Sequence, residues 1–224
     1  MPFVQENDNT GSGTSLGVAF LASPTAGNFL AYASGGDGDA TGVSDNRNGA
    51  ALKAGDVNNT GLAVYADIHF VRRHAGGGAT TATRTTASSS NHSLAVLEYD
   101  GCSSPQPRAA DPTTSTSGAS HSAGPVPAKN QDIAIAVVCC DTAFESYTPD
   151  GSFTERADTS GVRPIQVQDR MLTDDVPNLT ATITADLGGG GANRNLNSVL
   201  AVFDIVARAV RADYSDYPKF PLRS

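Results

Sequence analysis

Tryptophan is absent from this chain of 224 residues, and aromatic residues of all kinds make up only 6% of it. Lysine is also scarce, at Lys53, Lys129 and Lys219 only, and basic residues number 15 against 23 acidic ones, for a net charge of −8. Because nucleic-acid binding needs clustered Lys and Arg to neutralise phosphates, this balance argues against a nucleic-acid partner. The acidic surface instead keeps copies soluble until a specific contact forms.

Cysteines and long apolar runs are few as well. The 3 cysteines, Cys102, Cys139 and Cys140, fit neither a disulfide framework nor a zinc site. We interpret Cys139 and Cys140 as small buried residues on opposite faces of a strand. The longest apolar run, 133–140, is too short to cross a membrane, so we expect no membrane partner. Residues 1–15 lack the basic start and apolar core of a signal peptide, which predicts synthesis in the host cytoplasm without one.

The apolar residues that are present recur with a period of two. Residues 179–187 are apolar at every odd position and Thr or Asp at every even one, and residues 62–72 behave alike. This alternation predicts strands with one buried face and one face in water. No window has the period of an amphipathic helix. Further strands are predicted at 16–22, 28–34, 80–86, 93–99, 132–140, 165–171 and 198–206.

Turn-forming residues separate these segments, with 23 glycines and 12 prolines in the chain. About ten strands with turns between them predict an all-β fold with little helix, an antiparallel β-sandwich or jelly roll, formed by residues 1–207 as a single domain. The segment 103–129 is rich in Pro, Ser, Thr and Gly, which is compatible with a linker between two halves. We interpret it as a long surface connection, because the strands before it are too few to close a core.

Motifs for catalysis are weak. Gly13 to Gly17 has the GxSxG spacing of a nucleophile elbow, which requires a buried strand before the serine and a helix after it. Here a polar stretch precedes the motif and a predicted strand follows, so we attribute it to chance. The histidines show no metal-binding spacing, and His69 is expected on the polar face of its strand. We therefore predict that the protein is not an enzyme and has no cofactor.

One acidic segment has a spacing that calcium could use. Asp37, Asp39, Thr41 and Asp45 occupy the first, third, fifth and ninth places of a calcium-binding loop. Asn48 stands where the bidentate Glu of such a loop belongs. The same residues are also typical of a polar Gly/Asp turn, which we favour, with the calcium loop kept as the alternative.

Six short segments, in order, are similar to motifs of β-sandwich domains in bacteriophage structural proteins and bacterial surface proteins. They are 24–30 (PTAGNFL), 43–46 (VSDN), 75–81 (AGGGATT), 96–101 (VLEYDG), 153–156 (FTER) and 201–203 (AVF). The chain departs from the pattern after Gly49, where Ala50 and Ala51 replace an expected aromatic residue. The resemblance implies the fold and the setting, and it implies no catalytic residues. Taken without the resemblance, the charged residues set among the strands are interpreted as surface or half-buried ion pairs that fix strand ends. These are Glu98, the charged residues of 151–156, and Asp169 with Arg170.

From the resemblance and the acidic, motif-poor sequence we predict a structural protein of a phage virion. It would be a head decoration (cement) protein or a minor tail component on the outer surface, acting through contacts with capsid or tail proteins. A domain repeated on a particle is usually a symmetric homo-oligomer, and a trimer is one such arrangement. The alternative is a carbohydrate-binding receptor-recognition module of a tail tip or bacterial surface. The lack of Trp weakens it, because glycan sites use aromatic faces.

The last segment, 208–224, has an aromatic and basic composition unlike the rest. Pro218 and Pro221 exclude a helix or a central strand there. Aromatic side chains are strong anchors when they enter pockets on a partner. We predict an extended C-terminal arm that docks on a neighbouring subunit or on the underlying shell; the alternative is an arm that folds back on its own domain. The docking residues would be Tyr214, Tyr217, Phe220 and Leu222.

Overall fold

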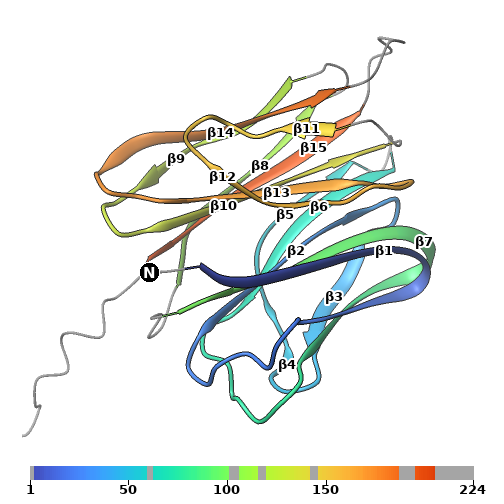
Figure 1. The fold of residues 1–224 in the computed structure, drawn as a ribbon. Helices are drawn as coiled ribbons and strands as arrows, with labels where there is room; N and C mark the ends of the chain where they lie inside the picture. Colours follow the sequence, from blue (N-terminus) through green and yellow to red (C-terminus); the bar gives the residue numbers. More distant parts are fainter. Residues whose placement is uncertain are drawn as a thin grey trace, which may run out of the picture.

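The computed structural model describes residues 3–59, 63–100, 106–115, 120–141, 146–186 and 195–204. These residues form fifteen strands and no helix, and every pairing between strands is antiparallel. The predicted all-β, antiparallel, sandwich-like fold is therefore confirmed (Figure 1).

The strands form three sheets, stacked as layers in Figure 1. The first sheet contains β1 (Phe3–Ala19), β2 (Phe29–Gly36), β3 (Ala40–Asp45), β4 (Gly49–Ala50), β5 (Leu52–Asn59), β6 (Val64–Val71) and β7 (Thr81–Tyr99). The middle sheet has the order β12 (Thr154–Asp158), β13 (Ile165–Met171), β10 (Ile133–Cys140), β15 (Leu196–Asp204), β8 (Gln106–Ser115). The outer sheet has the order β11 (Ser146–Thr148), β14 (Val176–Asp186), β9 (Ser120–Ala128).

The first sheet is built around the long strand β7. With the strands that pair along it, β7 forms a ribbon that bends and folds back on itself. β7 pairs along its whole length with β1 on one side, and on the other side it pairs with β2 and then β3. The β1–β7 register shifts between Gly13 and Ser15, where the ribbon bends. Leu16 of β1 and Leu30 of β2, from opposite sides of the bend, lie in one buried cluster. The folded ribbon therefore becomes a nearly closed, barrel-like sheet with its own interior.

Close approach of the chain at the bend requires glycine. A Cβ atom on Gly36 would lie 2.5 Å from the carbonyl oxygen of Asn91, and one on Gly38 would lie 2.8 Å from the side chain of Ser90. Real Cβ atoms almost never lie within 3.0 Å of such an atom. The short connection 37–39, where β2 passes into β3, is thus the place where the two halves of the ribbon meet.

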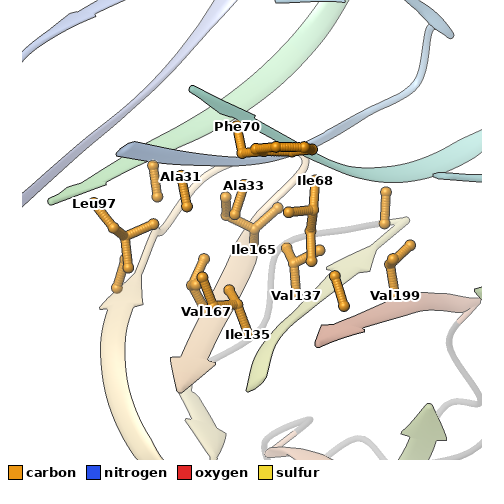
Figure 2. Packing of buried hydrophobic residues seen from close by; sticks show 14 of the residues in the cluster. Ala31, Ala33, Ile68, Phe70, Leu97, Ile135, Val137, Ile165, Val167 and Val199 are labelled. Atoms are coloured by element: carbon orange, nitrogen blue, oxygen red, sulfur yellow. The ribbon is translucent and has the colours of Figure 1, made fainter. Parts of the chain in front are cut away.

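Strands β10 and β15, in the interior of the middle sheet, are buried on both faces. All eight residues of β10 are buried. Ile135 and Val137 pack against the first sheet, as Figure 2 shows, whereas Ala134 and Ala136 pack against the outer sheet. A strand with two buried faces has a continuous apolar run instead of an alternating one, which explains the sequence of 133–140.

The two adjacent cysteines occupy the positions predicted for them. Cys139 belongs to the cluster between the first and middle sheets, and Cys140 belongs to a smaller cluster between the middle and outer sheets. Both side chains are buried. They fill space on opposite faces of β10, as small apolar residues would.

The structure differs from the expected surface connection at 103–129. This segment contains β8, which pairs with β15 in the middle sheet, and β9, which pairs with β14 in the outer sheet. Both strands lie at the end of their sheets in the strand order. An edge strand tolerates proline because one side of its backbone needs no partner. The composition that resembles a loop is therefore that of two edge strands, and the predicted boundary at 207 falls after the last described residue, Asp204.

The strand β1 was also not predicted over its first half. After Phe3 and Val4, residues 5–13 are polar or glycine and show no alternation, yet residues 3–13 pair with Ser90 to Tyr99 of β7. β1 pairs with no strand besides β7 among the described residues, so these residues are held by backbone hydrogen bonds and have little apolar surface to bury. Such a strand carries no periodic signal.

The register of β14 gives a direct test of the layer arrangement. Ile183 is 2% exposed and packs between the outer and middle sheets, whereas its neighbour Thr184 is exposed. We expect Ile183→Ala to lower the free energy of unfolding by about 2–5 kcal/mol, through lost burial and a residual cavity. Thr184→Ala should change it by less than about 0.5 kcal/mol. Urea denaturation of both variants measures this, and equal effects would contradict the register.

Candidate functional site at the loop end of the first sheet

Four of the six motif segments meet at the end of the first sheet opposite the bend. Glu98 of β7 is 1% exposed and accepts hydrogen bonds at its two carboxylate oxygens. The donors are the Thr25 amide at 2.8 Å, Asn28 Nδ2 at 2.6 Å and Gln5 Nε2 at 2.5 Å. The expectation of a surface or half-buried ion pair at Glu98 was wrong, since this carboxylate is a buried acceptor that ties the 24–30 segment to the sheet.

A second carboxylate organises the turn between β3 and β4. Asp45 accepts hydrogen bonds from the Tyr32 hydroxyl at 2.6 Å and from the main-chain amides of Arg47 at 2.7 Å and Asn48 at 2.6 Å. Burial alone raises the pKa of Asp45, but the hydrogen bonds from Tyr32 and Asn48 outweigh it and hold that pKa below its ordinary value. The charged form is therefore the one that shapes the turn.

The loop after β6 is joined to both of these segments. Asn48 Nδ2 lies 3.0 Å from Nδ1 of His74, and Asn48 Oδ1 accepts the Ala75 amide at 2.8 Å. The main-chain amide of His74 donates to Asn28 O at 2.8 Å, and the amide of Gly27 donates back to His74 O at 2.8 Å. We call this connected set the loop network. It fixes the relative positions of three loops that are far apart in sequence.

The residues of the calcium-loop alternative, Asp37, Asp39, Thr41 and Asp45, have separate partners. Asp37 accepts two hydrogen bonds from Asn91 at 2.7 Å, whereas Asp45 belongs to the turn described above. Within the described ranges, no three His, Cys, Asp or Glu residues are placed to hold a metal ion. The arrangement is that of a polar turn, and it gives the calcium alternative no support.

A buried polar cluster occupies the interior of the folded ribbon near its bend. Arg84 is 0% exposed; its Nε donates to Ser34 Oγ at 3.0 Å, its Nη1 lies 2.8 Å from His92 Nδ1, and its Nη2 is 3.6 Å from Asp67 Oδ2. Asp67 also accepts hydrogen bonds from Ser34 and from His69 Nδ1. His69 does lie on the polar face of β6, but that face is turned to the interior of the barrel and not to solvent.

The chemistry of this cluster is structural. In a Ser–His–Asp triad the histidine lies between the other two residues and takes the serine proton. Here Asp67 lies between Ser34 and His69, so the imidazole has no contact with the hydroxyl through which it could act as a base. Ser34, Asp67 and His69 are at most 3% exposed, which also closes them to a substrate. Ser15 of the GxSxG motif lies within β1, and no helix follows it among the described residues.

A surface pocket of about 520 Å³ adjoins the loop network. It lies between the β3–β4 turn and the loop after β6, so the network positions two of its walls. Its lining consists of Arg47, Asn48, Ala50, Leu52, Phe70, Val71, Arg72, Arg73 and Ala75. We call it the arginine pocket.

A second pocket, of about 290 Å³, lies between the first and middle sheets. Its centre is Arg156, whose guanidinium stacks 3.9 Å from the ring centroid of Phe3 and forms an ion pair of 2.9 Å with Asp169. Tyr99 donates to the same carboxylate at 2.8 Å. Arg156 and Asp169 of the middle sheet thus each contact an aromatic residue of the first sheet, which joins the two sheets at this pocket.

Comparison of the chain with protein-family models, with curated proteins and with solved structures finds no match. The described residues contain no helix with the length and hydrophobicity of a membrane span. The predicted arm residues Tyr214, Tyr217, Phe220 and Leu222 lie outside the described residues. The loop network and the arginine pocket both join residues that are far apart in the sequence, so neither could be located from residue spacing.

Replacing Glu98 tests the loop network. Glu98→Gln keeps the shape but leaves one oxygen and places an NH2 group against donors, so we expect a loss of about 1–3 kcal/mol in the free energy of unfolding. Asp174→Asn removes the same charge from an exposed turn and should have almost no effect. Urea denaturation of the two variants measures the difference, and a neutral Glu98→Gln would show that the network does not hold the loops.

The cluster at the bend predicts a dependence of stability on pH. Because guanidinium groups only donate, Nδ1 of His92 must accept from Arg84, while Nε2 donates to Gly13 O at 2.6 Å. Burial lowers the pKa of His92, and Arg84 lowers it further, so the folded state resists the proton that the unfolded chain takes up near 6.5. Stability is thus present above pH 6.5 and is lost as the pH falls below it.

We expect the melting temperature of the natural chain to fall between pH 7.5 and pH 5.5. His92→Gln should melt lower at pH 7.5, yet lose less on acidification, because the titrating group is gone. His74 shares the direction, since burial lowers its pKa too, so part of the slope will remain. An unchanged slope in the variant would contradict the assignment.

Proposed function

We propose that the protein is a non-enzymatic structural component of a phage virion, a head decoration protein or a minor tail component that acts through assembly contacts on the outer surface. The observation that supports this most is the loop network. Four segments that resemble phage structural domains are joined there by hydrogen bonds, so the resemblance falls on residues that specify the fold. Because these residues hold the loops in place, their similarity to segments of phage structural domains favours a similar fold.

The state of the reactive side chains also favours a structural role. The serine, histidine and aspartate groups that come close together are buried within the first sheet and already hydrogen-bonded to one another. The cysteines are buried, and burial raises the pKa of the Cys139 thiol to about 12, which leaves it protonated and unreactive. What the described surface offers is shape and charge, and these serve binding.

The carbohydrate-binding alternative has less support. Sugar sites use exposed aromatic faces. The large apolar side chains exposed on the described surface are Val4, Leu21, Leu52 and Val162, and no aromatic residue is among them. The homo-oligomer and the docking arm 208–224 remain part of the proposal.

Mass spectrometry of purified particles of the phage that encodes the chain tests the proposed function. A decoration protein should be present in a fixed ratio to the major capsid protein, with copies on the order of hundreds if it follows the shell symmetry, and a tail component in far fewer. Its absence from washed particles, with the protein present in the same lysate, would refute a virion role.

The same particles test the arm. A chain lacking residues 212–224 should keep its circular dichroism spectrum and melting temperature but fail to attach to particles made without the natural protein. Attachment at the natural level would mean that the arm is not a docking element.

A further inference from the structure

The arginine pocket is a concentration of positive charge on an acidic protein. Arg47, Arg72 and Arg73 line it, and no Asp or Glu does, although acidic residues outnumber basic ones by 23 to 15 over the chain. Its charge is complementary to an anionic ligand.

The pocket is held in shape before any ligand arrives. Nε of Arg47 donates to Ala79 O at 3.2 Å and its main-chain amide donates to Asp45, so this guanidinium stands on a fixed turn. Arg72 and Arg73 directly follow β6, next to His74, which the loop network anchors. Because the backbone around these three residues is fixed by hydrogen bonds, binding would require little ordering of loops.

The lining selects among anions and sugars. A guanidinium has donors only and matches a carboxylate with paired hydrogen bonds. The remaining polar side chain is Asn48, whose amide already bonds Asp45, His74 and Ala75. The pocket side chains thus offer donors and no open acceptor, which suits a carboxylate and does not suit a ligand with many hydroxyl groups.

The rest of the pocket is apolar. Phe70 and Val71 form a buried floor, and Leu52 is 48% exposed at the rim. An exposed leucine beside guanidinium groups favours a ligand that has an apolar group next to its carboxylate. A peptide with Asp or Glu beside a large apolar residue has that combination, and its backbone adds no cluster of hydroxyl groups.

We propose that the arginine pocket binds an acidic segment of another protein, with a carboxylate between the guanidinium groups and a neighbouring apolar side chain on Leu52. Under the proposed function it would be a contact made during assembly, and in that respect it rests on that function. The binding itself is a property of the isolated chain and is tested without particles.

The probe is a tetrapeptide of alternating leucine and glutamate with blocked ends, titrated into the full chain by isothermal calorimetry. The matched peptide with glutamine in place of glutamate should bind about tenfold more weakly or not at all, a difference of about 1.4 kcal/mol. Arg73→Gln should weaken binding of the acidic peptide by about tenfold as well. Arg73 is exposed, so this variant should keep the melting temperature of the natural chain.

Two further variants complete the design. Arg170→Gln removes the same charge from the other pocket and should leave peptide binding unchanged. Leu52→Ser should weaken binding of the peptide but not of free acetate. Equal binding of the two peptides, or Arg73→Gln binding as the natural chain does, would overturn the proposal.

Two other ligands are tested in parallel. Glucuronate binding tighter than the peptide would assign the pocket to an acidic sugar, and self-association abolished by Arg73→Gln would assign it to a second copy; either result overturns the proposal. If the protein binds the peptide but is absent from virions, the pocket proposal stands and the proposed function is refuted. If the protein is present in virions but does not bind the peptide, the proposed function stands and the pocket proposal is refuted.

Discussion

Arg84 is fully buried inside the folded first sheet, where an unpaired charge would cost several kcal/mol. Its guanidinium finds Ser34, Asp67 and His92, which come from three different strand segments, together with the carbonyl oxygen of Gly38 at 2.8 Å. These partners are in reach only when the ribbon is folded at its bend. The charge therefore makes the folded ribbon much more favourable than a flat one, and the barrel-like interior depends on it.

Because the ribbon folds at its bend, its two ends lie together at the opposite end of the first sheet. Once β7 is bent, the loops before β2, after β3 and after β6 lie at one end of the first sheet. Glu98 accepts a main-chain amide of the first of these loops and Asp45 accepts two of the second. The loop after β6 is joined to them by hydrogen bonds with Asn48, Asn28 and Gly27. The arginine pocket exists because these loops are held apart at a fixed spacing. The bend thus determines a surface at the opposite end of the sheet, through backbone geometry and without direct contact.

The middle sheet has a different role, since its strands β10 and β15 are buried between the other two sheets and pack against both. Aromatic rings from the first sheet pack against Phe203 of β15, with centroids 4.9 Å from Phe29 and 5.4 Å from Phe70. Phe70 is also the floor of the arginine pocket. The pocket is therefore built on the core between two sheets, and its floor cannot move without disturbing that core.

The sequence by itself determined the fold class and many of the strands. Alternation located β6 and β14, and the continuous run 133–140 located β10, because each of these signals is local. It could not show β8, β9 or the first half of β1, since edge strands are held by backbone bonds and tolerate polar residues and proline. Only the tertiary structure decided that the polar face of β6 is an interior, that Glu98 is buried, and that Arg47 meets Arg72 and Arg73 in one pocket. These facts depend on which strands become neighbours, and hydrogen bonds between residues as distant as Asn28 and Glu98 leave no trace in any short stretch of sequence.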